Sequence, residues 1–214
     1  SLPNNGSLSA VAARFRLRGE GQVEIRAPLT LLKGCRVTLE NLAIVPEVGT
    51  AINLAYSQLL LRDCEVRGGN LGVLGTDSIL ELEGSSVIGN GADNSGAAGV
   101  RCGGRSMLLA TESRIECPGV AVSGLRVALF DRCVISSTDR NGIEGGADSD
   151  LWMMASLLRA KRAPYQRVAR GLLEGVAIQS PAGTVPGGDP GVKACFDHLR
   201  VDGANREMGH GVWL

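Results

Sequence analysis

The sequence predicts an all-β fold in which short, similar turns of chain stack on one another, and three observations lead to this. First, an eight-residue unit, typified by residues 128–135, has apolar or small residues at its first, third, sixth and eighth positions. Second, the unit occurs eight times, and its third residue is number 39, 61, 82, 110, 130, 153, 173 or 196. Third, the 30 glycines stand between apolar segments instead of clustering. A repeat of this length indicates an array in which each unit buries its apolar face against its neighbours.

The spacing inside the unit predicts two strands and a corner. Apolar residues lie two apart, then three, then two, and a spacing of two is typical of a strand. The extra residue in the middle is therefore a bend. Each unit is followed by a return, the segment that leads to the next unit. A third short strand is expected in the return after a glycine, as at Gly72, Gly99, Gly119, Gly142 and Gly211. Three short strands per turn predict a single-stranded parallel β-helix of about nine rungs with three short parallel sheets. The eight units are residues 37–44, 59–66, 80–87, 108–115, 128–135, 151–158, 171–178 and 194–201.

We expect one elongated β-helix domain over residues 15–214, preceded by an arm or linker over residues 1–14. Leu17 stands in register with Leu39 one turn later, so residues 15–25 form an incomplete first rung. The last predicted strand ends beside the final residue and leaves strand edges open. We therefore expect the natural chain to continue, or another segment to cover this end.

Charge and hydropathy indicate which kinds of molecule the protein is expected to bind and whether it crosses a membrane. The formal net charge is zero, which favours neither nucleic acid nor an anionic membrane surface. No apolar run approaches the roughly 18 residues of a membrane helix. Residues 1–13 lack the features of a signal peptide. The cysteine pattern described next favours an intracellular, cytoplasmic protein, with secretion as the alternative.

The six cysteines fit a reducing compartment. Cys64 and Cys133 both occupy the inward sixth position of a unit and lie three rungs apart. At the spacing of paired strands this separation is about 14 Å, which is too far for a disulfide. Both are adequately explained as small buried hydrophobic residues.

The second position of each unit lies between two inward residues and is expected to face solvent. Five of these eight residues are large and apolar, which is typical of a surface covered by another protein or a neighbouring domain. A strand shift of one residue would instead exchange the inward and outward sets and place them in the core. Down the stack, the second positions are Thr38, Leu60, Glu81, Leu109, Leu129, Trp152, Leu172 and Cys195.

The fourth position is also outward and carries mostly acidic residues: Glu40, Arg62, Glu83, Thr111, Asp131, Met154, Glu174 and Asp197. The same position on adjacent rungs recurs every 4.8 Å or so. Glu174 and Asp197, followed by His198, therefore form a candidate catalytic group with about the carboxylate separation of a retaining glycosidase. Two close carboxylates would raise the pKa of one of them. The alternative is a solvated acidic face.

A long return carries five cations with no acid among them: Arg159, Lys161, Arg162, Arg167 and Arg170. This loop is a candidate site for an anionic ligand or an acidic partner surface, with Tyr165 as a stacking face; the alternative is a solvated basic loop. The sequence shows no zinc spacing and no phosphate-binding loop before a helix. The acidic run at residues 148–150 lacks the full spacing of a calcium loop. We expect no metal or cofactor, and calcium only if the protein acts on carbohydrate.

Units such as residues 37–44 and 59–66 resemble the repeats of the right-handed parallel β-helix, or pectin-lyase-like, superfamily. The superfamily includes pectate lyases, polygalacturonases, alginate epimerases and NosD-like proteins, and the same repeats occur in intracellular F-box proteins and in the SHC-binding spindle protein. The resemblance covers roughly residues 15–214 and implies the fold more strongly than any activity. Residues 209–211, Gly-His-Gly, look like a polygalacturonase element. Asp139 and the acidic run at residues 148–150 do not supply the carboxylate motifs that this family also needs.

The absence of a catalytic motif and the apolar outward residues favour a non-catalytic structural or protein-interaction module. A carbohydrate-active enzyme using Glu174, Asp197 and His198 is one alternative. A non-catalytic glycan binder with a groove beside Trp152 or Tyr165 is another. Only seven aromatic residues are present, which argues against both, because sugar rings are usually held on aromatic faces.

Overall fold

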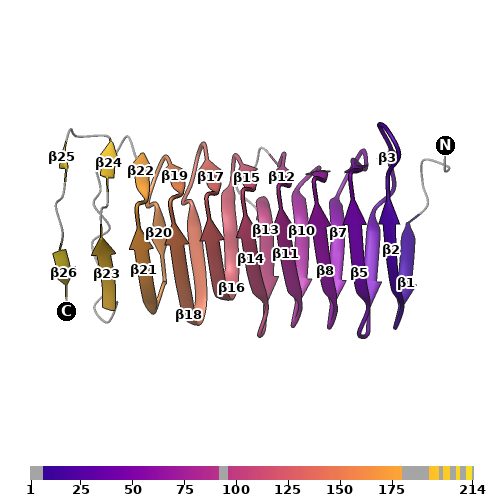
Figure 1. Cartoon of the computed structure of the whole chain (residues 1–214), viewed down its shortest axis with the longest axis horizontal. Helices are drawn as coiled ribbons and strands as arrows, with labels where there is room; N and C mark the ends of the chain where they lie inside the picture. Colours follow the sequence, from indigo (N-terminus) through magenta and orange to yellow (C-terminus); the bar gives the residue numbers. More distant parts are fainter. Residues whose placement is uncertain are drawn as a thin grey trace.

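The computed structural model shows an elongated parallel β-solenoid of about eight turns, in agreement with the predicted β-helix (Figure 1). It describes residues 7–91 and 96–179, and beyond them only the backbone of strands at residues 193–197, 200–202, 206–207 and 211–213. Every element in these ranges is a strand. Accordingly, no described segment has the helical length and apolar character needed to cross a membrane.

Each turn contributes strands to three faces. The first face carries the first strand of each unit, the second face carries the second strand, and the third face carries the return. The first face holds β2 (Arg14–Arg18), β5 (Arg36–Glu40), β8 (Gln58–Arg62), β11 (Ile79–Glu83), β14 (Met107–Thr111), the ends of β16 (Val120–Asp131) and β18 (Ile143–Met154), β21 (Arg170–Glu174) and β23 (Lys193–Asp197).

The strands of the second face are shorter, at two to four residues, whereas the strands that lie wholly on the third face have two to six. The second face holds β3 (Glu24–Ile25), β6 (Ala43–Ile44), β9 (Glu65–Gly68), β12 (Ser86–Gly89), β15 (Arg114–Cys117), β17 (Val134–Ser137), β19 (Leu157–Ala160), β22 (Ala177–Gln179) and β24 (Arg200–Asp202). The third face holds β1 (Leu8–Val11), β4 (Leu29–Leu32), β7 (Thr50–Ala55), β10 (Leu71–Thr76), β13 (Ala98–Gly103), the starts of β16 and β18, and β20 (Tyr165–Gln166).

Three separate sheets were predicted, but hydrogen bonding joins the first and third faces into one 16-stranded sheet beside a 10-stranded sheet. The cause lies in β16 and β18, which continue through the corner as strands of 12 residues each. Their pairing shifts register between Ser123 and Leu125 and again between Leu125 and Val127. Irregularities of this kind let a strand bend without ending.

The two ends of the solenoid also differ from expectation. β1 lies within the segment expected to be an arm or linker, and it pairs in parallel with β4. Residues 211–213 were predicted as the return strand of the last rung. They form β26 (Gly211–Trp213), which instead runs antiparallel to β23, and β25 (Arg206–Glu207) runs antiparallel to β24. The chain therefore doubles back instead of adding another parallel strand.

The core consists of the predicted inward positions, stacked in register. Leu39 aligns with Leu61, and Phe130 with Met153, on adjacent strands. From unit 37–44 to unit 171–178 the inward residues are buried, except the half-buried Gly171. The alternative one-residue shift of the strands is therefore wrong for the described units.

Small residues at the sixth position fit the corner between the first and second faces. The N–H of Cys64 donates to Ser85 Oγ at 3.1 Å, and the N–H of Ser85 donates to Ser113 Oγ at 3.1 Å. Cys133 and Ser156 repeat the contact at 2.9 Å. Serine supplies a compact acceptor for a backbone donor that would otherwise be buried without a partner.

The five cysteines whose side chains are described are all unpaired and buried. They are Cys35, Cys64, Cys102, Cys117 and Cys133. Burial raises the pKa of the Cys102 thiol to about 12 and also raises the pKa of Cys64, Cys117 and Cys133. These four thiols are therefore protonated packing groups and not nucleophiles.

Replacing Phe130 with alanine tests the inward assignment. Phe130 is fully buried, so Phe130→Ala is expected to lower the free energy of unfolding by about 3–5 kcal/mol through lost burial and the cavity left behind. Its outward neighbour provides the control: Leu129→Ala is expected to cost under about 1 kcal/mol. Urea unfolding of both variants makes the comparison, and equal losses would contradict the assignment.

Candidate functional site

The predicted outward apolar residues form a stripe on the first face. Leu109, Leu129, Trp152 and Leu172 are register partners on the consecutive strands β14, β16, β18 and β21. Adjacent strands lie about 4.8 Å apart, so the four residues span about 14 Å along the solenoid. Leu60 belongs to the same column but is separated from Leu109 by Glu81.

The strand pleat fixes this outward direction. Trp152 stands between Leu151 and Met153, whose side chains are 2% and 0% exposed. Successive side chains of a strand point to opposite faces, so Trp152 projects outward and keeps 41% of its surface exposed. Leu172 is 37% exposed, and Leu129 and Leu109 are half-buried by their neighbours in the column.

Four further apolar residues, which were not predicted to belong to the stripe, widen it. Ile79, Met107 and Val127 are half-buried register partners in the column just before the first inward position, and Met154 is 38% exposed at a fourth position. The same alternation of side chains would have found the first three. We call the combined surface the apolar patch. It consists of Leu60, Ile79, Met107, Leu109, Val127, Leu129, Trp152, Met154 and Leu172.

Charged pairs lie at two edges of the apolar patch. Toward the C-terminal end, Arg170 donates two hydrogen bonds to the carboxylate of Asp150, at 2.6 and 2.7 Å. On the fourth-position side, Arg132 contacts Asp131 at 2.6 Å and Glu112 at 3.0 Å. The patch thus has an apolar centre and a polar rim, which is the arrangement of protein–protein interfaces.

The expected acidic row is not uniformly acidic. At its N-terminal end, side chains of alternating sign form a ladder: Arg16 contacts Glu40 at 2.6 Å, Glu40 contacts Arg62 at 3.5 Å, and Arg62 contacts Glu83 at 2.5 Å. Hydrogen bonding from Arg16, followed by Arg62, holds the pKa of Glu40 below its usual range despite the opposing effect of burial. This stretch is a charge-balanced structural network and not an acidic surface.

The candidate catalytic group is only partly described. Glu174 and Asp197 are register partners on β21 and β23, as predicted. Glu174 is exposed, whereas the side chain of Asp197 and all of His198 lie outside the described residues. The stripe position Cys195 and the Gly-His-Gly element at residues 209–211 also lack described side chains.

The five cations of the long return do not form one uncompensated basic surface. Arg159 lies on β19 in the second face and donates to Gln179, whereas Arg170 lies on the first face and pairs with Asp150. Lys161 contacts Asp139 at 3.4 Å. The N–H of Arg162 donates to the carbonyl of Arg140, and the carbonyl of Arg167 accepts from Ser149.

Two further sequence-based candidates have structural roles in this region. The ring of Tyr165 is half-buried and packs against the core, and burial raises the pKa of its hydroxyl. Asp150 is engaged by Arg170. Within residues 7–91 and 96–179, no group of three or more metal-ligating side chains could hold an ion.

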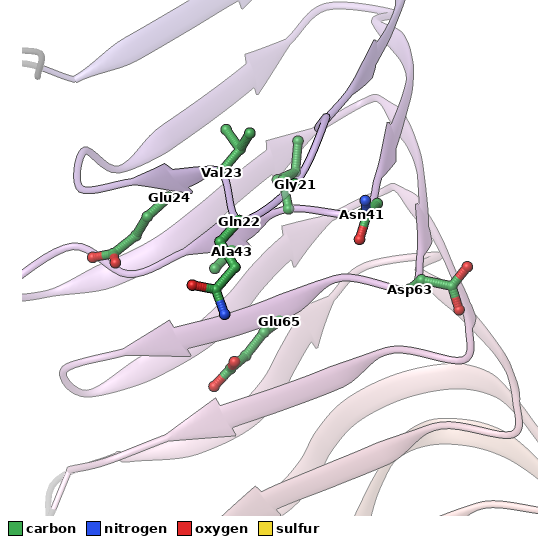
Figure 2. A pocket seen from close by; sticks show the side chains of 9 residues that line it. Gly21, Gln22, Val23, Glu24, Asn41, Ala43, Asp63 and Glu65 are labelled. Carbon is green, nitrogen blue, oxygen red and sulfur yellow. The ribbon is translucent and has the colours of Figure 1, made fainter.

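A groove of about 430 Å³ lies on the second face near the N-terminal end (Figure 2). Glu24 on β3 and Glu65 on β9 extend from the strands at the groove, and Asp63 lines it at the corner before β9. Glu24 is paired with Arg26 at 2.8 Å, and Glu65 is paired with Arg67. Two of the three acidic side chains that line the groove are therefore engaged by arginine.

Comparison of the chain with protein-family models, with curated proteins and with solved structures gave no match.

Proposed function

We propose that this chain is a non-catalytic β-helix module that binds another protein or a neighbouring domain through the apolar patch. The observation that carries the proposal is the alignment of Leu109, Leu129, Trp152 and Leu172 on four consecutive strands with inward residues buried on either side. A solvated sheet face ordinarily alternates apolar inward with polar outward residues. A continuous apolar column outside the core indicates a surface that is covered when the protein works.

Protein is the partner class that this surface chemistry favours. Trp152 and Leu172 project from a rigid backbone, so an apolar partner surface can cover them at little cost in conformational entropy. The Asp150–Arg170 and Asp131–Arg132 pairs at the rim offer charged groups to a partner.

We also propose that the chain is a member of the pectin-lyase-like β-helix superfamily whose role is closest to that of its intracellular, non-enzymatic members. Three strands per turn and stacked inward columns support this assignment. Five buried, unpaired thiols support a reducing compartment, because disulfides form and persist in oxidising ones.

Charge placed in the centre of the patch tests the proposed interface. Leu129→Glu and Trp152→Glu each introduce a carboxylate that would lose its hydration under a partner, so each is expected to weaken partner binding by at least tenfold. The measurement is quantitative mass spectrometry of proteins retained by the immobilised chain, followed by titration calorimetry with the purified partner.

Matched controls place the same charge on another face of the same turns. Val134 on β17 and Leu157 on β19 are outward and half-buried, so Val134→Glu and Leu157→Glu are expected to keep partner binding. Unchanged partner recovery with Leu129→Glu and Trp152→Glu would contradict the proposal, as would equal losses in all four variants.

Glycan processing is a second candidate because Glu174 and Asp197 occupy paired positions on adjacent strands. The proposal predicts turnover of a uronate-containing or neutral polysaccharide, with or without calcium, that falls by at least about a hundredfold in Glu174→Gln. Reducing-end and unsaturated-product assays on the wild type measure it. No turnover on any substrate, or full activity of Glu174→Gln, would contradict this candidate.

A further inference from the structure

One carboxylate interrupts the apolar patch. Glu81 on β11 stands between Leu60 on β8 and Leu109 on β14 as their register partner, and Ile79 holds the neighbouring outward position of its own strand. The residues on either side of Glu81 in β11 are buried, so Glu81 points outward. Glu81 is itself half-buried. Apolar side chains therefore flank this carboxylate on three sides.

No cation neutralises Glu81 within the part of the chain that the structure describes. Its carboxylate makes neither an ion pair nor a hydrogen bond there. Arg62 lies on the preceding turn, and its carboxylate contacts are with Glu40 and Glu83. The outward residues of β14, on the following turn, carry no charge. The carboxylate of Glu81 therefore depends on water while the patch is uncovered.

A partner that covers the patch would remove this water. Leu60, Glu81 and Leu109 occupy consecutive strands about 4.8 Å apart, so an apolar surface that contacts both leucines also lies over Glu81. A carboxylate that loses its hydration without meeting an opposite charge weakens binding, whereas a close charge pair across an interface can strengthen it. The partner therefore has to bring a cation to this one position.

The need for a cation argues against a second copy of this chain as the partner. None of the second positions of the eight units, from Thr38 to Cys195, is lysine or arginine. Two copies packed column against column therefore give Glu81 no cation in any alignment. In the alignment that matches equivalent turns, Glu81 would face Glu81 of the other copy, and like charges directly opposite each other are destabilising.

The shape of the patch favours an α-helix laid along the stack. The column from Leu60 to Leu172 crosses six consecutive strands and is about 24 Å long. Each of these strands is already paired on both sides, so no partner strand can be added among them. A helix presents one face every three or four residues, or about every 5 Å at its rise of roughly 1.5 Å per residue. This repeat is close to the spacing of the column.

We propose that the partner contacts the apolar patch through an amphipathic α-helix, whose apolar face covers Leu109, Leu129 and Trp152 and whose arginine or lysine pairs with Glu81. This inference rests on the proposed function, because it names the partner segment for the same patch. Apolar contacts supply most of the affinity in this mode of recognition. The pair with Glu81 fixes where the helix lies along the column and selects basic helices over acidic ones.

Two fluorescent peptides test the proposal by anisotropy at low salt. Both form an amphipathic helix with leucines three and four residues apart along one face and glutamines on the other. They differ only at the first position of the leucine face, which is arginine in one peptide and glutamate in the other. The arginine peptide is expected to bind the whole chain at least tenfold more tightly than the glutamate peptide.

Charge reversal at Glu81 locates the contact. In Glu81→Lys the preference is expected to invert, so that the glutamate peptide binds more tightly. The control Glu47→Lys makes the same change in net charge at an exposed position between β6 and β7, and it is expected to keep the preference for the arginine peptide. Circular dichroism and a thermal melt confirm that each variant is folded.

Trp152→Glu separates this proposal from the interface itself. Equal binding of both peptides to the wild type, with loss of both in Trp152→Glu, would leave the apolar patch as a binding surface and overturn the role of Glu81. Absence of binding by the arginine peptide, or inversion of the preference by Glu47→Lys, would also overturn the proposal.

Discussion

The structure depends on corner residues with a left-handed backbone, and above all on the one between the two strands of each unit. The fifth position of each unit, between the two strands, has positive φ in every described unit: 51° at Asn41, 48° at Asp63, 50° at Glu112, 51° at Arg132 and 45° at Ala155, with glycine in the other two. The N–H of this residue donates to the carbonyl of the fourth position one turn later, as from Asn41 to Arg62 at 3.0 Å. The corner therefore extends the hydrogen-bonded ladder between turns.

This repeated corner keeps successive turns in register, and the positions of the outward side chains follow from that register. Because the corner repeats at the same position, the outward columns stack without drift, and the apolar patch and the Arg16–Glu40–Arg62–Glu83 ladder both lie on fixed backbone. The solenoid thus holds its outward side chains, whatever their type, at intervals of about 4.8 Å along its axis. The core residues explain why the turns stack, whereas the outward residues distinguish one turn from another.

Much of the fold could be predicted because it rests on size and polarity, which a sequence displays directly. Leu39, Leu61 and Phe130 are recognisable as inward by spacing alone, and the bend by the extra residue. The positive φ of the corner residue could not be predicted from its residue type. Glu112 and Arg132 have no intrinsic preference for positive φ, and they adopt it to keep the hydrogen-bonded ladder between turns. The merging of two faces into one sheet depends on how β16 and β18 bend, which composition does not encode.

The candidate site was predictable to a similar degree. Reading second positions down the stack identified Leu109, Leu129, Trp152 and Leu172, because register follows from the core pattern. Contacts between particular side chains were harder to predict from the sequence. Arg62 contacts Glu40 and Glu83, and Asp150 pairs with Arg170, and these contacts depend on how far the side chains reach across turns. The cations of the long return looked like one cluster only because they are close in sequence.

The corner constraint is tested most directly at Ala155, a residue with a Cβ held at a φ of 45° where the next turn uses Gly175. The left-handed conformation costs a residue with a Cβ roughly 1–2 kcal/mol, partly offset by the smaller unfolded-state entropy of alanine than of glycine. Urea unfolding should therefore show Ala155→Gly to be more stable than the wild type by about 0.5–1 kcal/mol, and Ala155→Val to be less stable. A destabilised Ala155→Gly together with an unaffected Ala155→Val would contradict the account.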